Sequence, residues 1–435
     1  MPTVDFLLRS YDQTEAFACH SDSLDNVLAF QYEFLSLFPG LANFDTNTIR
    51  PELIKSSEIE ANIEAFIKKA EGEIPAIHRI GSFIRNLADG ETFFVFPTSE
   101  LDRKVSFHIS NLLSARYHKE DFEETQTSMN ELFGGLLDKY DIFPYGNKRK
   151  AIGNSSKADR ICRFCQNTRI PLAFKKRAHA ISEALGNKTL VLHDECDGCN
   201  EEFSRTLEPQ IIEFFSLYRT IYEIKGKGGT KKFSGKNFKI GRNEDELLEI
   251  SFSDLEKIEP ENQDVVEDAP KLPFTITLHS NKKISRQNLY RCFCKFFLSV
   301  IPEELLPQFR ETIKWTNSEF DIDKLPQIIE FNFPHSFQEQ PVLLVFIRRD
   351  NDQSVPFAVC EFQFTFHRYI FIIPRSTADS KDFSEKENFD NFLSVFSHLN
   401  RAQDGMYVDF SDAKMRDFVI NCNFVKNNQS DEIVE

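Results

Sequence analysis

The sequence predicts an α+β protein in which a small cysteine-rich module lies between two larger domains. Segments with helical periodicity and segments with strand-like alternation follow one another in separate groups along the 435 residues. Two Cys-x-x-Cys pairs lie near the middle of the chain. With 41% hydrophobic and 28% charged residues, the composition is that of a globular protein long enough for two or three cores. We therefore expect an N-terminal domain of unknown role at 1–147, the module at 158–224, a basic loop and acidic linker at 225–270, and an α+β accessory domain at 271–426.

The N-terminal domain is expected to combine helices and strands. In Ser57–Lys69 and in Phe122–Tyr140, apolar residues recur at helical spacing. The segment Glu91–Pro97 is typical of a short buried strand that ends at a proline. No catalytic arrangement is visible in this sequence, and its isolated histidines are expected to be surface or structural residues: His78, His108 and His118.

The two cysteine pairs predict a structural metal site. Cys162 and Cys165 form the first pair, and Cys196 and Cys199 form the second after 30 intervening residues. Four thiols in this arrangement can bind Zn²⁺ tetrahedrally, and such a closed site stabilises a fold without activating water. The alternative is four unrelated buried thiols. The remaining five cysteines lie among apolar neighbours and are expected to be small buried residues: Cys19, Cys292, Cys294, Cys360 and Cys422.

Between and after the cysteine pairs, the pattern predicts a hairpin followed by a helix. Ala178–Ile181 and Thr189–Leu192 are strand-like, and Gly186-Asn187 forms the turn between them. Asn200 is expected to cap the helix that follows, and Pro209 is expected to break or restart that helix. Strand, turn, strand and helix inside a zinc-knuckle frame make a ββα-metal arrangement.

The C-terminal part is expected to form an α+β domain. Gln287–Ser299 has helical periodicity, and a second helix is expected after Pro302. The segment Asp254–Asp268 is acidic and polar and is typical of a linker. Four segments are strand-like and predict a largely antiparallel sheet: Phe274–Leu278, Val342–Ile347, Phe357–Phe366 and Tyr369–Ile373.

The distribution of charge is uneven although the net charge is −16. Lys148–Lys188 contains eleven Lys or Arg against two acidic residues, and Lys225–Arg242 contains seven basic residues and no acidic one. Because exposed charges are screened within about 10 Å, phosphate binding depends on such local clusters of basic residues and not on the net charge of the whole chain. The alternative is that both basic segments are solvated loops. The segment Lys225–Lys232 is glycine-rich but lacks the spacing of a nucleotide-binding loop.

The motifs around the hairpin resemble those of a known family. Cys162-x2-Cys165, Ala178-His179-x-Ile181-x-Glu183-x-Leu185-Gly186-Asn187 and Glu195-Cys196-Asp197-x-Cys199-Asn200 are similar to the core of HNH endonucleases, in a bacterial branch of that family. The resemblance covers the module, reaches the C-terminal half weakly and does not extend to 1–145.

The resemblance implies a role for each matching residue. His179 matches the general base that takes a proton from the attacking water, and a single divalent ion, Mg²⁺, would hold the scissile phosphate. Asn200 matches the asparagine that orders the site, and the amide of Asn187 is expected to orient the base. These roles are carried by the resemblance and not by spacing alone.

Three positions depart from the usual HNH pattern. Ala178 stands where many members carry a metal-binding Asp or His, Phe203 stands where His or Lys is frequent, and Ser182 replaces a proline. Metal ligation is therefore expected from other residues, and the candidates are Glu183, Glu208 and His193.

The leading functional hypothesis is a metal-dependent endonuclease that cuts nucleic acid, with double-stranded DNA as the expected partner and phage or plasmid defence as the implied role. The alternative is a non-catalytic zinc module that binds nucleic acid or a partner protein; an RNA-cutting enzyme is a weaker third option. No apolar run approaches the length of a membrane span and the first residues do not resemble a secretion signal, so a cytoplasmic protein without membrane contact is expected. A homo-oligomer is left open.

Overall fold

We describe a computed structural model of the chain. It describes residues 1–435 except 45, 47, 71–76, 147–149, 227–228, 230–231, 244–246, 253–273, 334–335, 397–404 and 425–435. The predicted acidic linker therefore lies outside the described residues. The chain divides into two compact units, Met1–Asp138 and Lys139–Glu435. None of the described helices combines the length and apolar composition that a membrane crossing requires.

The first unit is built on an antiparallel sheet of four strands in the order β2-β1-β6-β5. These strands are Thr14–His20, Thr3–Arg9, Thr92–Phe96 and Glu52–Ile54. The β3–β4 hairpin is Ala42–Asn43 with Thr48–Ile49. The prediction of a buried strand at Glu91–Pro97 is confirmed, because Phe93, Phe94 and Val95 of β6 are almost fully buried.

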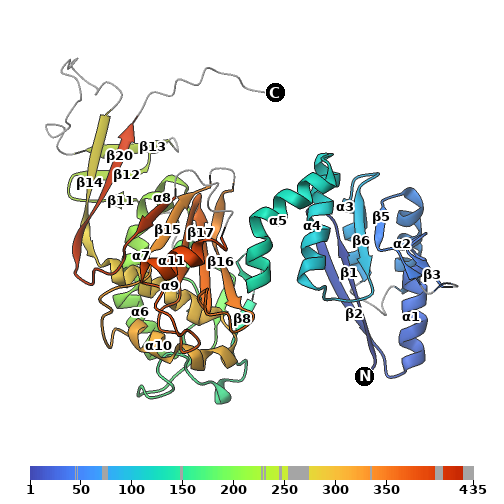
Figure 1. The fold of residues 1–435 in the computed structure, drawn as a ribbon, viewed down its shortest axis with the longest axis horizontal. Coiled ribbons are helices and arrows are strands. Elements are labelled where there is room, and N and C mark those ends of the chain that lie inside the picture. Colours follow the sequence, from blue (N-terminus) through green and yellow to red (C-terminus); the bar gives the residue numbers. More distant parts are fainter. Residues whose placement is uncertain are drawn as a thin grey trace. The chain divides into compact units, whose positions relative to one another are not determined.

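Helices α1 Leu24–Ser36, α2 Ser57–Ala70, α3 Ile77–Asn86 and α4 Arg103–His118 pack against this sheet (Figure 1). Helix α5, Phe122–Lys139, lies beside α4. The predicted helices at Ser57–Lys69 and Phe122–Tyr140 are confirmed within one residue. Phe6 and Phe34 lie with their ring centroids 4.4 Å apart in the hydrophobic core of this unit, whose described residues lie between Val4 and Val95.

The second unit contains a sheet of six strands in the order β19-β15-β18-β17-β16-β7, in which all neighbours are antiparallel. In that order they are Met406–Val408, Ile328–Asn332, His367–Ile372, Ala358–Thr365, Gln338–Arg348 and Tyr140–Tyr145. The strands predicted around Val342–Ile347, Phe357–Phe366 and Tyr369–Ile373 are confirmed. The sequence assigns 140–145 to the N-terminal domain, whereas the structure pairs this segment, as β7, with β16.

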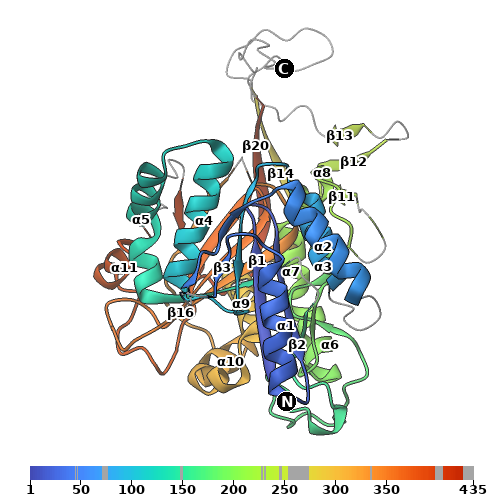
Figure 2. The same ribbon diagram turned by 90° about the vertical axis from the view of Figure 1, so that its right-hand side faces the viewer.

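Helix α9, Arg286–Val300, packs on one face of this sheet (Figure 2). Phe293 stacks on Tyr369 and Phe371, and the hydroxyl of Tyr290 donates a hydrogen bond to Ile372 O. After α9 come a 3-10 helix, Glu303–Phe309, and α10, Arg310–Thr316. The predicted helix at Gln287–Ser299 and the expected helix after Pro302 are therefore confirmed. On the opposite side, Phe396 packs on Phe346 and follows α11, Lys386–Leu393.

A two-stranded antiparallel ribbon extends from the body of the second unit in both views (Figures 1 and 2). It consists of β14, Phe274–Ile284, and β20, Arg416–Phe424. One face of the ribbon packs against β11 Phe233–Ser234, β12 Phe238–Arg242 and β13 Leu248–Phe252.

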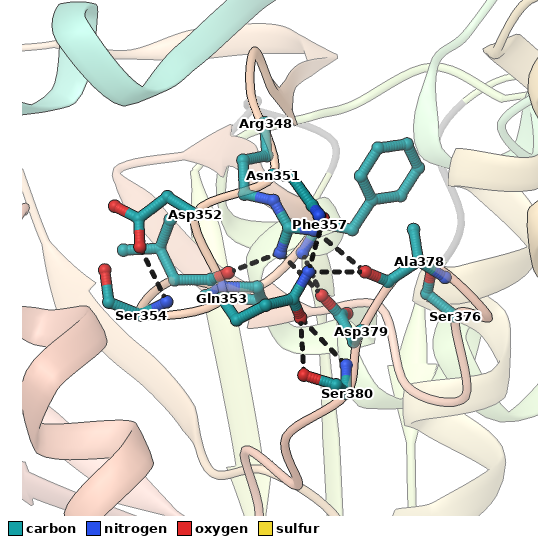
Figure 3. Close-up of polar contacts among 12 residues, drawn as sticks. Arg348, Asn351, Asp352, Gln353, Ser354, Phe357, Ser376, Ala378, Asp379 and Ser380 are labelled. Carbon is teal, nitrogen blue, oxygen red and sulfur yellow. Dashed lines mark hydrogen bonds and ion pairs between the residues drawn. The ribbon is translucent and has the colours of Figure 1, made fainter.

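A polar network fixes the loop after β18 to the end of β16 (Figure 3). The guanidinium of Arg348, whose side chain is 2% exposed, donates to Asp379 Oδ1 at 2.9 Å and to Ala378 O at 2.8 Å. Gln353 Oε1 accepts from the backbone N of Ser380 at 2.8 Å. Burial raises the pKa of Asp379 to about 6, although the Arg348 charge and the Phe357 amide act in the opposite direction. The network therefore supplies the opposite charge that a buried arginine requires.

The cysteine module belongs to the second unit and shares its core. Its small sheet has the order β8-β10-β9, with strands Lys150–Ile152, Leu190–Leu192 and Ala178–His179. Its helices are α6 Asp197–Thr206, α7 Glu208–Phe214 and α8 Ser216–Ile221, with 3-10 turns at Lys157–Asp159 and Glu183–Leu185. Buried residues of the module and of α9 form one continuous hydrophobic cluster. The protein is thus of the predicted α+β class, with the cysteines inside its larger core.

Candidate functional site

The structure brings the four predicted cysteines together. The Sγ atoms of Cys162, Cys165, Cys196 and Cys199 all lie within 4.8 Å of one another, and those of Cys165 and Cys196 are 3.6 Å apart. A tetrahedral S₄ site with metal–sulfur bonds of about 2.3 Å requires sulfurs about 3.8 Å apart. The cluster therefore has the composition and the spacing to hold a structural metal such as zinc.

Local hydrogen bonds shape the first cysteine pair into a knuckle. Gln166 and Asn167 have positive φ angles of 49° and 62°, which turn the chain back after Cys165. The side-chain oxygen of Asn167 accepts a hydrogen bond from the backbone N of Cys162 at 2.8 Å. In addition, Cys196 N donates to the sulfur of Cys162 at 3.4 Å, which links the two pairs directly. Asparagine tolerates the left-handed conformation better than most residues, which explains its place in this turn.

The predicted hairpin is present, but its strands are shorter than expected. Ala178 pairs with Leu192 and His179 with Val191, in antiparallel register. The prediction missed a third strand, β8, which runs parallel to β10. This strand lies in a glycine- and serine-rich segment for which the sequence predicts no strand.

His179 is a partly buried histidine beside one carboxylate. Its side chain is 12% exposed, and its Nε2 lies 3.6 Å from Glu183 Oε2. Burial lowers the pKa of His179, and Arg177 and Lys295 lower it further, while Glu183 raises it. The distance is too long for a hydrogen bond, so Glu183 acts on the imidazole through its charge. A histidine with a lowered pKa is neutral at pH 7 and can accept a proton.

Asn187 organises the hairpin loop. Its Nδ2 donates to Ile181 O at 2.6 Å and to Leu190 O at 3.1 Å, and its Oδ1 accepts from Leu190 N at 2.9 Å. These partners are backbone groups of the loop and not the ring of His179. Any effect of Asn187 on the base therefore acts through the shape of the hairpin, and its catalytic role stays a prediction.

The prediction that Asn200 caps the helix is wrong. Helix α6 begins at Asp197 with Cys196 as its N-cap, so Asn200 lies in the helix interior. The carboxylate of Asp197 accepts hydrogen bonds from the backbone N of Lys175 and Lys176 at 2.9 and 2.8 Å. Asp197 thus holds the basic segment before β9 against the start of α6. The restart of the helix near Pro209 is confirmed, because α7 begins at Glu208.

The three candidate ligands for a second metal lie in different surroundings. Glu183 has a half-exposed side chain beside His179. Glu208 accepts a hydrogen bond from the Ser182 hydroxyl at 3.1 Å, and its other oxygen lies 3.9 Å from Lys295 Nζ. His193 follows β10 and lines a pocket together with Lys150, Arg160 and Lys175. Within the described part of the chain, only the four cysteines bring three or more His, Cys, Asp or Glu ligand atoms together.

Two buried charged residues near the backbone of His179, Lys295 and Glu195, were not predicted as site residues from the sequence. Lys295 comes from α9, and its Nζ donates to His179 O at 3.0 Å and lies 3.2 Å from Glu195 Oε2. The side chains of Lys295 and Glu195 are 1% and 0% exposed. Burial raises the pKa of Glu195 to about 7, and the Lys295 charge opposes this rise. The sequence signal was a single lysine inside the apolar run Cys292–Leu298, but nothing in that run indicates its partners.

Two of the positions that depart from the HNH pattern, 178 and 203, are occupied by buried apolar side chains. Phe203 is 2% exposed, and its ring lies edge-on to Phe164 with centroids 4.8 Å apart. The ammonium of Lys295 is 5.8 Å from the centroid of the Phe203 ring. Ala178 is buried at 1% exposure. Positions 178 and 203 therefore contribute packing instead of ligands.

A basic pocket of about 410 Å³ adjoins β9 and the strands next to it. All of its charged lining residues in the described part of the chain are basic: Lys150, Lys157, Arg160, Lys175, Lys176 and Arg177. Ala178 and His193 also line it. Because Ala178 directly precedes His179, the pocket lies next to the strand that carries the candidate base. The first basic segment predicted from the sequence thus contributes six cations to one surface.

Comparisons with known proteins find no matching family model, no characterised protein and no solved structure with significant similarity to this chain.

Proposed function

We propose that the chain is a metal-dependent endonuclease of the HNH type that hydrolyses phosphodiester bonds in nucleic acid, with double-stranded DNA as the expected substrate. The observation that carries this proposal is that β9, the strand of His179, borders a pocket lined by six basic residues, which Ala178 of the same strand also lines. A base next to a phosphate-binding surface is the arrangement that hydrolysis of a nucleic-acid backbone requires.

The basic pocket supports a polyanionic substrate. Six cations around about 410 Å³ create a local positive field although the whole chain is acidic. Contacts of this kind bind phosphates through charge and are largely independent of base sequence. We therefore expect binding that weakens steeply with salt.

The lowered pKa of His179 supports a role of this residue as the general base. Because burial lowers its pKa, the imidazole is neutral at pH 7 and can accept a proton. In the proposed reaction, water attacks phosphorus, its proton passes to His179, and the bond to the 3′ oxygen of the nucleotide breaks. Glu183, at 3.6 Å, stabilises the imidazolium that results.

Glu183 is also the side chain best placed to hold a catalytic Mg²⁺, because it is half-exposed and lies beside the base. Magnesium is usually bound by one or two carboxylates together with substrate phosphates and water, so a cage of three protein ligands is not required. When bound, the ion would stabilise the negative charge on the leaving oxygen. We assign Zn²⁺ to the four cysteines, where it has a structural role.

A second candidate function is a non-catalytic zinc module that binds nucleic acid or a partner protein. It is favoured by the absence, among the described residues, of a second group of three metal-ligating side chains. The involvement of Glu208 with Ser182 and Lys295 favours it as well, because this carboxylate is not free for a metal in the structure.

Plasmid nicking tests the proposal. The zinc-loaded protein is incubated with supercoiled plasmid in the presence of Mg²⁺, Mn²⁺ or excess chelator. We expect conversion to the open-circular form only with the divalent ion. In the His179→Ala variant we expect the rate to fall by about 100-fold or more, which is the usual contribution of a general base.

The matched control is His279→Ala, which removes an exposed histidine from β14 in the same unit. Its nicking rate should equal that of the wild type. No metal-dependent nicking, or equal nicking by wild type and His179→Ala, rules out the catalytic assignment. Salt-sensitive binding of duplex DNA without nicking then favours the second candidate.

A further inference from the structure

Lys295 is a fully buried cation on α9, where it lies between buried aromatic residues of the same helix. Its side chain is 1% exposed, and its neighbours Phe296 and Phe297 are completely buried. Removing an ammonium group from water costs several kcal/mol unless nearby groups compensate for it. An apolar residue would satisfy the packing at this position, so the charge requires another explanation.

The ammonium group contacts three segments of the cysteine module. Nζ donates a hydrogen bond to the backbone O of His179 on β9 at 3.0 Å. It lies 3.2 Å from Glu195, which precedes the second cysteine pair, and 3.9 Å from Glu208, the first residue of α7. One side chain from α9 therefore connects the strand of the candidate base, the second knuckle and the helix that carries a candidate ligand.

The contact with Glu195 accounts for only part of this arrangement. Glu195 is completely buried, and among the described residues neither of its carboxylate oxygens accepts a hydrogen bond of good geometry. Lys295 compensates for that charge, and one carboxylate would already be enough to pair with it. The additional contacts reach the backbone of His179 and the carboxylate of Glu208, whose other oxygen is held by Ser182. These are the groups around the proposed reaction site.

We propose that Lys295 is a positioning residue of this site, which fixes the backbone of His179 and the carboxylate of Glu208, so that α9 completes the site from outside the module. The inference rests on the proposed function for its catalytic consequence. It assigns a role to a residue that lies 116 positions away from His179 in sequence. A displacement of about 1 Å at a reacting group can reduce the rate by about 100-fold.

The test uses the double variant Lys295→Met/Glu195→Gln in the full-length protein. It removes both fully buried charges together, because removing Lys295 alone would leave Glu195 unpaired in the core. We expect the variant to fold and to retain its zinc. In the nicking assay its kcat should fall by about 100-fold while KM for the plasmid stays within about twofold, since the phosphate-binding pocket is untouched.

Hydrogen exchange gives a second readout that does not depend on activity. Peptides covering 178–192 should exchange faster in the variant, while peptides of the first unit should be unchanged. If the double variant does not fold, Lys295→Gln/Glu195→Gln replaces it, because the amides keep hydrogen-bonding capacity in the core. The matched control is Lys314→Met/Glu311→Gln, which removes an exposed lysine–glutamate pair from α10 and should change neither readout.

The outcomes separate the two proposals. A kcat within about twofold of wild type in the folded variant, or hairpin exchange equal to wild type, overturns the role of Lys295 even if wild type nicks DNA. If wild type does not nick, the proposed function is wrong, and the exchange rates alone decide whether Lys295 positions the hairpin.

Discussion

His367 is a buried histidine that has no part in the proposed reaction but should control stability in acid. It lies on β18, is 8% exposed, and packs against Tyr218 with ring centroids 3.9 Å apart. Burial lowers its pKa from 6.5 to about 4, and the charge of Arg368 acts in the same direction. The folded protein therefore binds a proton at this ring only at low pH, whereas the unfolded chain binds it below about pH 6.5.

We predict that this difference destabilises the second unit as pH falls from about 6.5 towards 4. Between pH 7 and pH 5 the contribution of His367 to the free energy of unfolding should fall by about 2 kcal/mol, because the unfolded state binds more protons in this range. Urea unfolding of wild type and of His367→Leu at both pH values measures it. The variant should lose less stability than wild type, and His279→Leu, an exposed control, should not differ from wild type. Identical pH dependence in wild type and His367→Leu would contradict the prediction.

The site residues that the sequence revealed are those whose partners are close in sequence or follow a fixed spacing. Cys162 and Cys165 form a knuckle within four residues, and the second pair repeats this spacing, so the metal site could be predicted without a fold. Lys295 could not be predicted in this way. Its role depends on the packing of α9 against the module, and no local pattern specifies which buried carboxylates face a given lysine.

At the scale of elements, periodicity predicted the long helices well and the short strands poorly. Helix α2 has an apolar face that repeats over its whole length, so its limits are almost those expected. Strand β9 has two residues and β8 has three, which is too short for a periodic pattern. Both pair with β10, whose first residue donates its backbone N–H to Asn187 Oδ1. The start of α6 was misplaced because Asp197 binds the preceding loop and Cys196 takes the capping position.

The network between β16 and the loop after β18 gives a prediction at this scale. Asp379→Ala removes the carboxylate that pairs with the buried guanidinium of Arg348 at 2.9 Å. Leaving one partner of a buried ion pair without the other costs about 3–5 kcal/mol, so the free energy of unfolding of the second unit should fall by that amount. Urea denaturation measures the change. Asp390→Ala breaks an exposed pair with Lys386 on α11 and should cost less than about 1 kcal/mol. Equal losses in the two variants would show that the Arg348 network does not stabilise the loop.

At the scale of the molecule, the two units differ in what their cores contain. The core of the first unit, around Phe6 and Phe34, includes no cysteine of the proposed zinc site. The core of the second unit includes Cys162, Cys196 and Cys199 together with Phe293 of α9. A sequence-based division into module and accessory domain could not show this shared core. Packing between segments that are far apart in the sequence produces no recognisable pattern in either segment alone.

The shared core predicts that metal loss affects one unit and spares the other. Metal binding to four thiolates contributes directly to folding free energy, so Cys196→Ser should remove the zinc, of which we expect about one ion per chain in wild type. In thermal unfolding, one transition should then fall by about 10 °C or more, while the transition of the first unit moves by less than about 2 °C. Leu8→Ala, which creates a cavity in the core of the first unit, identifies that transition by lowering it alone. Elemental analysis without zinc in wild type would disprove the metal assignment. A fall of both transitions in Cys196→Ser would instead show that the stability of the first unit depends on the zinc site, despite its separate core.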